Sequence, residues 1–252
     1  MTLLAVCGDA STTSAYALAT AWPSPDVLLV EADPSGGDLA AWLDLPEQPG
    51  VATAVTMAPT GSWPVIEAQV QRHGSLPVLV MPILAAEAAI AAREAAARVM
   101  PTVSALAGVT AIADCGRCVP SVLSPVVTQA AIVAVTIRQP STSPRAAAAH
   151  LDRVRELVAA LDARALPTVA VLVGEEPYRA SEIADFLGGP DAAVPVLVLA
   201  DDPVGAAMVA GRERIGRGFH RSHLAKSATA AASELAVRLA SALSVDVEVV
   251  EP

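Results

Sequence analysis

The chain has 252 residues and a formal net charge of −10 at pH 7; 54% of its residues are hydrophobic and only 3% are aromatic. This length allows one large domain whose core is built from Ala, Val and Leu. The acidic balance argues against broad nucleic-acid binding, and no apolar run reaches the ~18 residues that a membrane span needs. Three cysteines make no disulfide framework, and no basic region precedes the first apolar stretch, so we expect a cytoplasmic protein without a signal peptide.

Strands and helices alternate along the chain. Short apolar runs bounded by turn residues predict buried strands at residues 3–7, 27–30, 78–81, 109–113, 131–137, 168–173 and 196–199. Alanine-rich or amphipathic segments predict helices at residues 12–21, 85–107, 144–161, 180–187 and 222–243, and residues 38–75 are expected to hold short helical pieces broken by prolines. The pattern predicts one α/β domain, residues 1–252, with a doubly wound, mostly parallel sheet of about seven strands flanked by helices.

The second predicted strand ends in a group of acidic and turn residues. Glu31 and Asp33 follow the apolar run, and Gly36, Gly37 and then Asp38 lead toward a helix whose start Asp38 can cap. A carboxylate at a strand end commonly holds Mg²⁺ or a water beside a phosphate. A turn that favours Asp and Gly for conformational reasons alone explains the stretch equally well.

Two further strand ends belong beside this one. The first strand runs into Gly8 and then a helix start at Ser11, Thr12 and Thr13, where P-loop proteins hold phosphate with backbone N–H groups and a lysine. The strand at residues 109–113 ends at Asp114. Because ligands collect at the carboxyl ends of parallel strands, we expect these residues to form one site.

These motifs resemble the MinD/ParA family of deviant P-loop ATPases, which position cellular machinery. Residues 11–13 with Leu18 and Ala19 are similar to the family's K-T-T-x-x-x-x-L-A, residues 31–34 to its D-x-D-P, and residues 111–114 to its Walker B strand. The C-terminal half, with residues 174–178, 182–184, 202–203 and 211–212, is similar to a MinD-like branch often encoded beside Tad-type pilus assembly genes. The resemblance covers most of the chain and implies the fold, a nucleotide-type pocket and a role in positioning or assembly.

The departures from the family pattern concern the phosphate. Lys226 is the only lysine, so Ser11 stands at the P-loop lysine position and Val6 or its neighbours stand at the signature lysine position. Only Gly8 remains of the loop glycines, and Asp9 places a carboxylate where polyphosphate would lie. Two like charges ~4 Å apart repel by about 4 kcal/mol at an effective dielectric of 20. The sequence therefore predicts a degenerate P-loop and a pseudo-ATPase.

The predicted site residues follow from the resemblance. The candidates for nucleotide contact are Gly8, Ser11, Thr12, Thr13, Asp33, Asp114 and Arg117. The resemblance implies that Thr12, Asp33 and Asp114 hold Mg²⁺ weakly, and that Asp33 has a catalytic role only if the protein is active. We expect no resident cofactor, and Mg-ATP at low affinity if it binds.

Three cysteines and one arginine also lie near the predicted site. Cys115 and Cys118 have C-x-x-C spacing, and Cys7 ends a neighbouring strand. A redox or zinc role is open, but structural zinc needs four ligands, so buried structural thiols are the favoured interpretation. Arg117 could bind an anion, neutralise Asp9 or simply be solvated.

Two classes of function remain. One is a non-hydrolysing scaffold for a protein partner, such as a pilus or secretion motor or an intact paralogue, with any homodimer independent of ATP. The other is an enzyme, either an ATPase that uses Arg117, Arg138 or Arg145 in place of the lysine, or a ligase of the related synthetase type. A basic cluster at residues 212–226 suits an acidic partner better than DNA. The acidic end, residues 245–252, argues against a direct membrane anchor.

Overall fold

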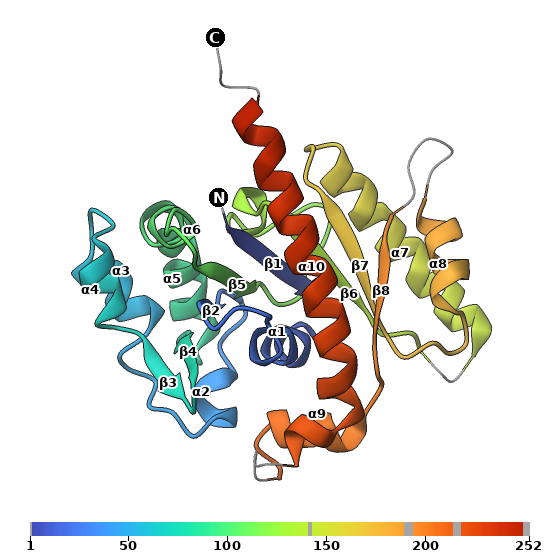
Figure 1. Cartoon of the computed structure of the whole chain (residues 1–252), viewed down its shortest axis with the longest axis horizontal. Helices are drawn as coiled ribbons and strands as arrows, with labels where there is room; N and C mark the ends of the chain where they lie inside the picture. The colour runs from blue at the N-terminus through green and yellow to red at the C-terminus, as the bar shows by residue number, and fades with distance from the viewer. Residues whose placement is uncertain (1, 141–142, 189–193, 214–217, 249–252) are drawn as a thin grey trace.

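The computed structural model describes residues 2–140, 143–188, 194–213 and 218–248. An eight-stranded sheet at its centre has the order β3-β4-β2-β5-β1-β6-β7-β8 (Figure 1). Every neighbouring pair is parallel except β3 with β4. The strands are β1 (Leu3–Gly8), β2 (Val27–Glu31), β3 (Gln71–His73), β4 (Leu76–Leu79), β5 (Thr110–Asp114), β6 (Ile132–Ile137), β7 (Thr168–Val173) and β8 (Val196–Leu199).

The sheet confirms the predicted doubly wound fold and corrects the strand number from seven to eight. The additional strand is β3, which pairs antiparallel with β4 in a short hairpin. Its three residues, Gln71, Arg72 and His73, carry no apolar pattern, so no strand was predicted there. In β4 the strand also begins two residues before the predicted start.

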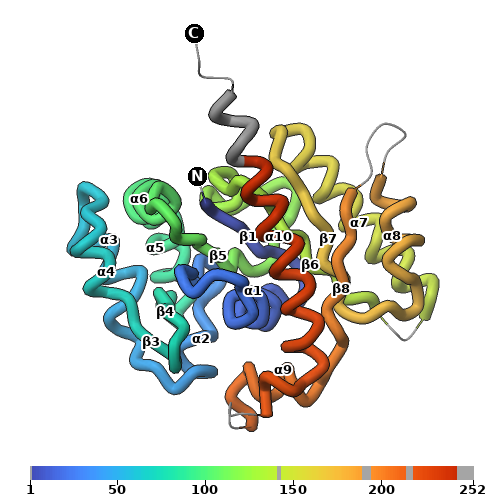
Figure 2. Tube along the Cα trace, in the orientation of Figure 1, coloured from blue at the N-terminus to red at the C-terminus, as the bar shows by residue number. Residues whose placement is uncertain are grey.

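Helices cover both faces of the sheet. They are α1 (Ser11–Thr20), α2 (Leu39–Trp42), α3 (Val51–Met57), α4 (Trp63–Glu67), α5 (Ala85–Arg98), α6 (Met100–Ser104), α7 (Pro144–Asp162), α8 (Ala180–Leu187), α9 (Pro203–Val209) and α10 (His223–Glu248), with the 3-10 turns η1 (Val127–Gln129) and η2 (Phe219–Arg221). The sequence did not predict α9, which Asp202 caps by accepting a hydrogen bond from the backbone N–H of Gly205. The chain between β2 and α5 gathers at one edge of the sheet (Figure 2).

Two apolar cores sandwich the sheet because side chains alternate between the faces of each strand. Along β1, Leu3, Ala5 and Cys7 face the core under α3 to α8, whereas Leu4 and Val6 face the core under α1, α2, α9 and α10. The predicted apolar stripe of α10 is buried in the second core, and that of α7 in the first. Abundant alanine in these helices lets them pack closely on the strands.

Strand order places the candidate site at a topological switch point. From β1 the sheet continues through β5 on one side and β6 on the other. In such sheets the loops diverge at the carboxyl ends of the strands and leave a crevice there. Among the described residues, no helix is both long and apolar enough to span a membrane.

Candidate functional site

The carboxyl ends of β1, β2 and β5 bring the predicted site residues together. In the sheet register Asp114 of β5 lies beside Val6 of β1 on one side and beside Glu31 of β2 on the other. The loop that leaves β1 enters α1 at Ser11. The three sequence motifs therefore meet at one edge of the sheet, as predicted.

Asp114 is fully buried and only half satisfied. Its Oδ1 accepts a hydrogen bond from the backbone N–H of Gly116 at 3.1 Å, whereas its Oδ2 is buried without a hydrogen-bond partner in the described part of the chain. Burial raises the pKa of Asp114 to about 6, and the nearby hydroxyls of Thr12 and Ser11 lower it in part. An unpartnered buried carboxylate oxygen beside two hydroxyls is chemistry that suits a hard cation.

Asp33 lies close to the same carboxylate. Its Oδ1 accepts a hydrogen bond of 2.7 Å from the backbone N–H of Ser35, and its negative charge contributes to the raised pKa of Asp114. Gly116 has φ +64°, and a Cβ there would overlap the Asp33 carboxylate. Glycine at this position is what allows the ends of β2 and β5 to approach so closely.

Glu31, matched in sequence to the first acid of the D-x-D-P motif, has a structural role. Its Oε1 accepts hydrogen bonds from the backbone N–H groups of Asp38 and Leu39 (2.6 and 2.9 Å), and its Oε2 accepts one from Met81 (2.8 Å). Burial raises the pKa of Glu31 to about 7 against the effect of these donors. Asp38 occupies the N-cap position of α2, as predicted, but its side chain makes no cap hydrogen bond, so that part of the prediction is wrong.

The loop between β1 and α1 is closed by protein groups. The backbone N–H of Gly8 donates to the carbonyl of Gly116 (2.9 Å), and that of Asp9 donates to the carbonyl of Thr136 (3.0 Å). Gly8 has φ +116°, and a Cβ there would lie 2.3 Å from the Thr136 carbonyl oxygen. Close approach to β6 therefore accounts for the one glycine that the loop retains.

Asp9 has a partner that the sequence did not indicate. Its Oδ2 lies 2.7 Å from Nε2 of His150 in α7, and the same oxygen accepts a hydrogen bond from the backbone N–H of Arg138 at 3.2 Å. Both side chains are largely buried, with 25% of Asp9 and 16% of His150 exposed. Arg117, for which anion binding, neutralisation of Asp9 and simple solvation were all open, is exposed and forms no ion pair with a described residue.

Helix α1 begins without a side-chain cap. Ala10 occupies the N-cap in a left-handed conformation (φ 51°), which is uncommon for a residue other than glycine. Ser11 is buried, and Thr12 and Thr13 are partly exposed in the first turn. The N-terminal end of the helix favours an anion, but no side chain in residues 8–13 is cationic.

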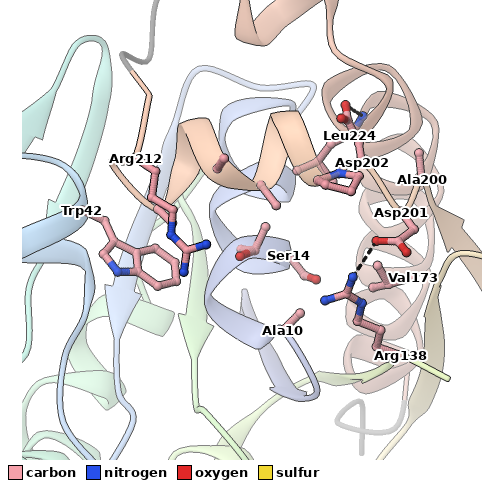
Figure 3. A pocket seen from close by; sticks show the side chains of 15 residues that line it. Ala10, Ser14, Trp42, Arg138, Val173, Ala200, Asp201, Asp202, Arg212 and Leu224 are labelled. Carbon is pink, nitrogen blue, oxygen red and sulfur yellow. Dashed lines mark hydrogen bonds and ion pairs between the residues drawn. The ribbon is translucent and has the colours of Figure 1, made fainter. Parts of the chain in front are cut away.

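A cavity of about 310 Å³ lies beside the first turns of α1, between α1 and α9. Arg138 and Asp201 line one end of it and form an ion pair of 3.0 Å, while Arg212 and Trp42 line the other end (Figure 3). Of the arginines proposed as lysine substitutes, Arg138 reaches this cavity. Arg212 was assigned to the basic cluster rather than to the site, and Arg214 and Arg217 of that cluster lie outside the described residues.

The three cysteines converge next to the site. The hydrogen bond between the Cys7 and Cys118 thiols raises the pKa of Cys7 and lowers that of Cys118. Burial raises the pKa of Cys7 further and opposes the lowering at Cys118. Burial also raises the pKa of Cys115. All three are free and buried in the core below α3 to α8. Within the described ranges, no group of three or more His, Cys, Asp or Glu side chains is arranged to hold a metal.

Comparison with known proteins places this fold. No family model and no curated protein matches the sequence. A ParA family ATPase from Chlorobium tepidum TLS superposes with a TM-score of 0.70 at 17% identity, covering 92% of this chain and 98% of that one. The fold is that of the ParA and MinD ATPases. At such low identity the likeness concerns the fold, and the chemistry of the site has to be judged from its own residues.

Two MinD structures extend the comparison. MinD from Pyrococcus horikoshii OT3, crystallised with Mg-ADP, gives a TM-score of 0.61 at 14% identity, covering 89% of this chain and 93% of that one. A MinC:MinD complex from Aquifex aeolicus gives 0.61 at 16% identity, covering 92% and 94%. One of these relatives thus holds a nucleotide with its metal, and the other a protein partner.

The two halves of the site differ in how well they fit Mg-nucleotide. Asp114, Asp33 and Thr12 would hold the metal, which would supply positive charge to neighbouring phosphate oxygens. The loop at residues 8–11 fits phosphates poorly, because its side chains include a carboxylate but no cation and two of its N–H groups already donate to protein carbonyls. The site thus offers carboxylates suited to a cation, and the loop beside them offers no positive side chain to an anion.

Proposed function

We propose that the chain is a degenerate MinD/ParA-like protein, a non-hydrolysing scaffold or regulator that positions or assembles a pilus, secretion or partitioning machine. The observation that carries the proposal is the closed loop, in which Asp9 pairs with His150 and no lysine is available. Phosphoryl transfer depends on cationic groups that stabilise charge developing on the phosphate. A loop that presents a carboxylate there works against both binding and turnover.

Exposed apolar side chains at the same sheet edge support docking of a protein partner. Ile83 and Leu84 follow β4, and Val119 and Val122 follow β5, with between 45% and 72% of each residue exposed. These loops flank the candidate site, so a partner bound there would contact the region that nucleotide controls in an active relative. The MinC:MinD complex supplies a precedent for a protein partner on this fold.

An active ATPase that uses arginine is the second candidate. The observation that favours it is Arg138, which lies in the cavity beside α1 together with Arg212 (Figure 3). Against it stands the ion pair of Arg138 with Asp201, which a phosphate would have to displace. We therefore place this candidate second.

Titration with Mg-ATP beside a phosphate-release assay separates the two candidates. Each charge-assisted hydrogen bond lost with the lysine removes about 1.5–3 kcal/mol, and repulsion by Asp9 adds to the loss. A total near 4 kcal/mol is about a thousandfold, so we expect millimolar binding in place of micromolar, and no turnover. Micromolar binding that Arg138→Ala weakens, with turnover abolished by Asp33→Ala, would establish the arginine-based ATPase instead.

The same proposal predicts that any self-association is independent of nucleotide. Family dimers sandwich ATP, and the signature lysine reaches across to the partner's phosphates, but Val6 or its neighbours stand at that position here. Light scattering with and without Mg-ATP should give the same mass. A mass that doubles only when Mg-ATP is present would contradict the pseudo-ATPase proposal.

A further inference from the structure

Aromatic side chains are concentrated at one place in this aromatic-poor chain. The whole protein has three Trp, two Tyr, two Phe and four His residues. A single cavity of about 390 Å³ is lined by Tyr16, Trp22 and Phe219 together with His73 and His220. This volume lies within the ~300–1,000 Å³ range of small-molecule sites.

The cavity lies away from the candidate nucleotide site. Its walls come from the C-terminal half of α1, the start of β2, the tip of the β3–β4 hairpin and η2. Helix α1 has ten residues, so its two ends are about 15 Å apart at 1.5 Å per residue. The loop at residues 8–11 is at the N-terminal end of α1, and Trp22 follows the C-terminal end of that helix. The two sites are therefore distinct, and both α1 and β2 run from one to the other.

The rings form an open cluster. Tyr16 contacts Phe219 at 5.8 Å between ring centroids and His73 at 6.1 Å, with interplanar angles of 63° and 67°. Phe219 contacts His220 at 6.1 Å and 65°. These are edge-to-face contacts, which aromatic rings favour, and none of the pairs is stacked. Tyr16 and Phe219 are each only 2% exposed, so a small part of each ring faces the cavity.

Hydrogen-bonding atoms of both kinds are available at the cavity. Within the described part of the chain, neither the Tyr16 hydroxyl nor the Trp22 indole N–H has a protein hydrogen-bond partner, and neither atom is among the fully buried unpartnered ones. Both polar atoms are therefore accessible, although the two residues are mostly buried. His73 Nδ1 lies 3.2 Å from the carbonyl oxygen of Leu43. Because a carbonyl only accepts, Nδ1 carries the proton, and Nε2 of the neutral ring is an acceptor.

Among the described residues, the cavity wall carries no Asp, Glu, Lys or Arg, although the protein as a whole has a net charge of −10. A strongly charged ligand would lose its hydration there without gaining a countercharge. A purely aliphatic ligand would leave the Tyr16, Trp22 and His73 polar atoms unpaired. The lining selects for a ligand that is neutral, flat and able both to donate and to accept.

We propose that this cavity binds a neutral heteroaromatic molecule whose ring edge carries both a hydrogen-bond donor and an acceptor. Tyr16, Trp22 and Phe219 supply the apolar ring contacts, and the Tyr16 hydroxyl and His73 imidazole recognise the ring edge. The ligand contacts the C-terminal half of α1, at the end opposite the loop at residues 8–11. This is a second site, separate from the site that resembles those of the MinD and ParA proteins.

Fluorine NMR with 2-fluoroadenine as the probe tests the proposal on the full chain. Binding should broaden the probe signal in the presence of the wild-type protein. Fluorocyclohexane, which is aliphatic, and 3-fluorobenzoate, which is anionic, should stay sharp. Ala19→Leu places a larger side chain on the cavity wall and should weaken 2-fluoroadenine at least tenfold. Ala206→Leu enlarges a residue that lines the other cavity, between α1 and α9, and is the matched control that should leave binding unchanged.

A second variant keeps the test independent of folding. His220 is exposed, so His220→Ala should preserve the thermal unfolding midpoint and still weaken the probe severalfold. The proposal is overturned if the probe stays sharp with the wild-type protein, or if neither Ala19→Leu nor His220→Ala weakens it. It is equally overturned if Ala206→Leu alone abolishes binding, because the probe would then occupy the other cavity.

Discussion

The two sides of the candidate nucleotide site differ in how far protein groups already occupy them. On the carboxylate side, Asp33 and Asp114 meet at the ends of β2 and β5, with one buried oxygen unpartnered among the described residues. On the loop side, Asp9 is paired with His150, and the N–H groups of Gly8 and Asp9 are paired with backbone carbonyls. One side is left open to a cation, and on the other side the Asp9 carboxylate and both N–H groups contact protein groups. Nε2 of His150 lies within ion-pair distance of Asp9 but forms no hydrogen bond with a described residue. The presence of Asp33 and Asp114 is thus no evidence that the loop beside them binds phosphate.

Replacing the buried carboxylate should give the largest effect. At pH 8 the native state carries an ionised Asp114 whose pKa is raised to about 6 from 3.8, which corresponds to about 3 kcal/mol of destabilisation. Asp114→Asn keeps an acceptor for Gly116 and removes the charge, so it should raise the free energy of unfolding by about 2–3 kcal/mol. Urea denaturation at pH 8 measures this change.

The pH dependence of that difference has a definite sign. A carboxyl whose folded pKa is raised stabilises the fold at low pH and loses that contribution as the pH rises through the folded pKa. The advantage of Asp114→Asn should therefore shrink to about half between pH 8 and pH 5. Asp33→Asn is the matched control, expected to change stability by less than about 0.5 kcal/mol. A less stable Asp114→Asn at pH 8 would mean that the ionised carboxylate is itself stabilising.

Opening the loop side should have a smaller effect. His150→Ala leaves Asp9 with only the Arg138 backbone N–H, and loss of a largely buried pair should lower the free energy of unfolding by about 1 kcal/mol. Asp152→Ala on the same helix is the control, because its pair with Arg155 is more than half exposed and Arg155 keeps its contact with the Phe186 ring. Equal losses in the two variants would show that the Asp9–His150 pair does not hold the loop.

Restoring the lysine alone should change least. Ser11→Lys returns the missing charge, but Asp9 stays in place and the Gly8 and Asp9 N–H groups remain engaged. We expect its Mg-ATP affinity to stay within about threefold of the wild type by calorimetry, which is less than 1 kcal/mol. The triple variant Asp9→Gly/Ala10→Gly/Ser11→Lys removes the acid and places glycine at the left-handed residue, and it should bind more tightly than Ser11→Lys. Micromolar binding by Ser11→Lys itself would show that the loop was intact.

Local pattern was sufficient for most of the fold. Seven of the strands overlap the apolar runs from which the sequence predicts them, and the strand at residues 196–199 and the helix at 180–187 begin and end where the sequence predicts. The hairpin strand β3 was missed because three polar residues carry no periodic signal, and its pairing with β4 decides its conformation. Helix α9 was missed because it is short and is defined mainly by the Asp202 cap.

The sequence alone determined which residues meet at the site and that the loop at residues 8–13 contains no lysine. Both can be read directly from the strand ends and the residue identities. Tertiary structure decided what those residues do. The partner of Asp9 is His150, which is 141 positions away in α7. The Glu31 carboxylate accepts a hydrogen bond from the backbone N–H of Met81, which is 50 positions away. The aromatic cavity likewise joins η2 to the end of α1. Such contacts depend on how helices and loops pack across the sheet, and local periodicity carries no record of that packing.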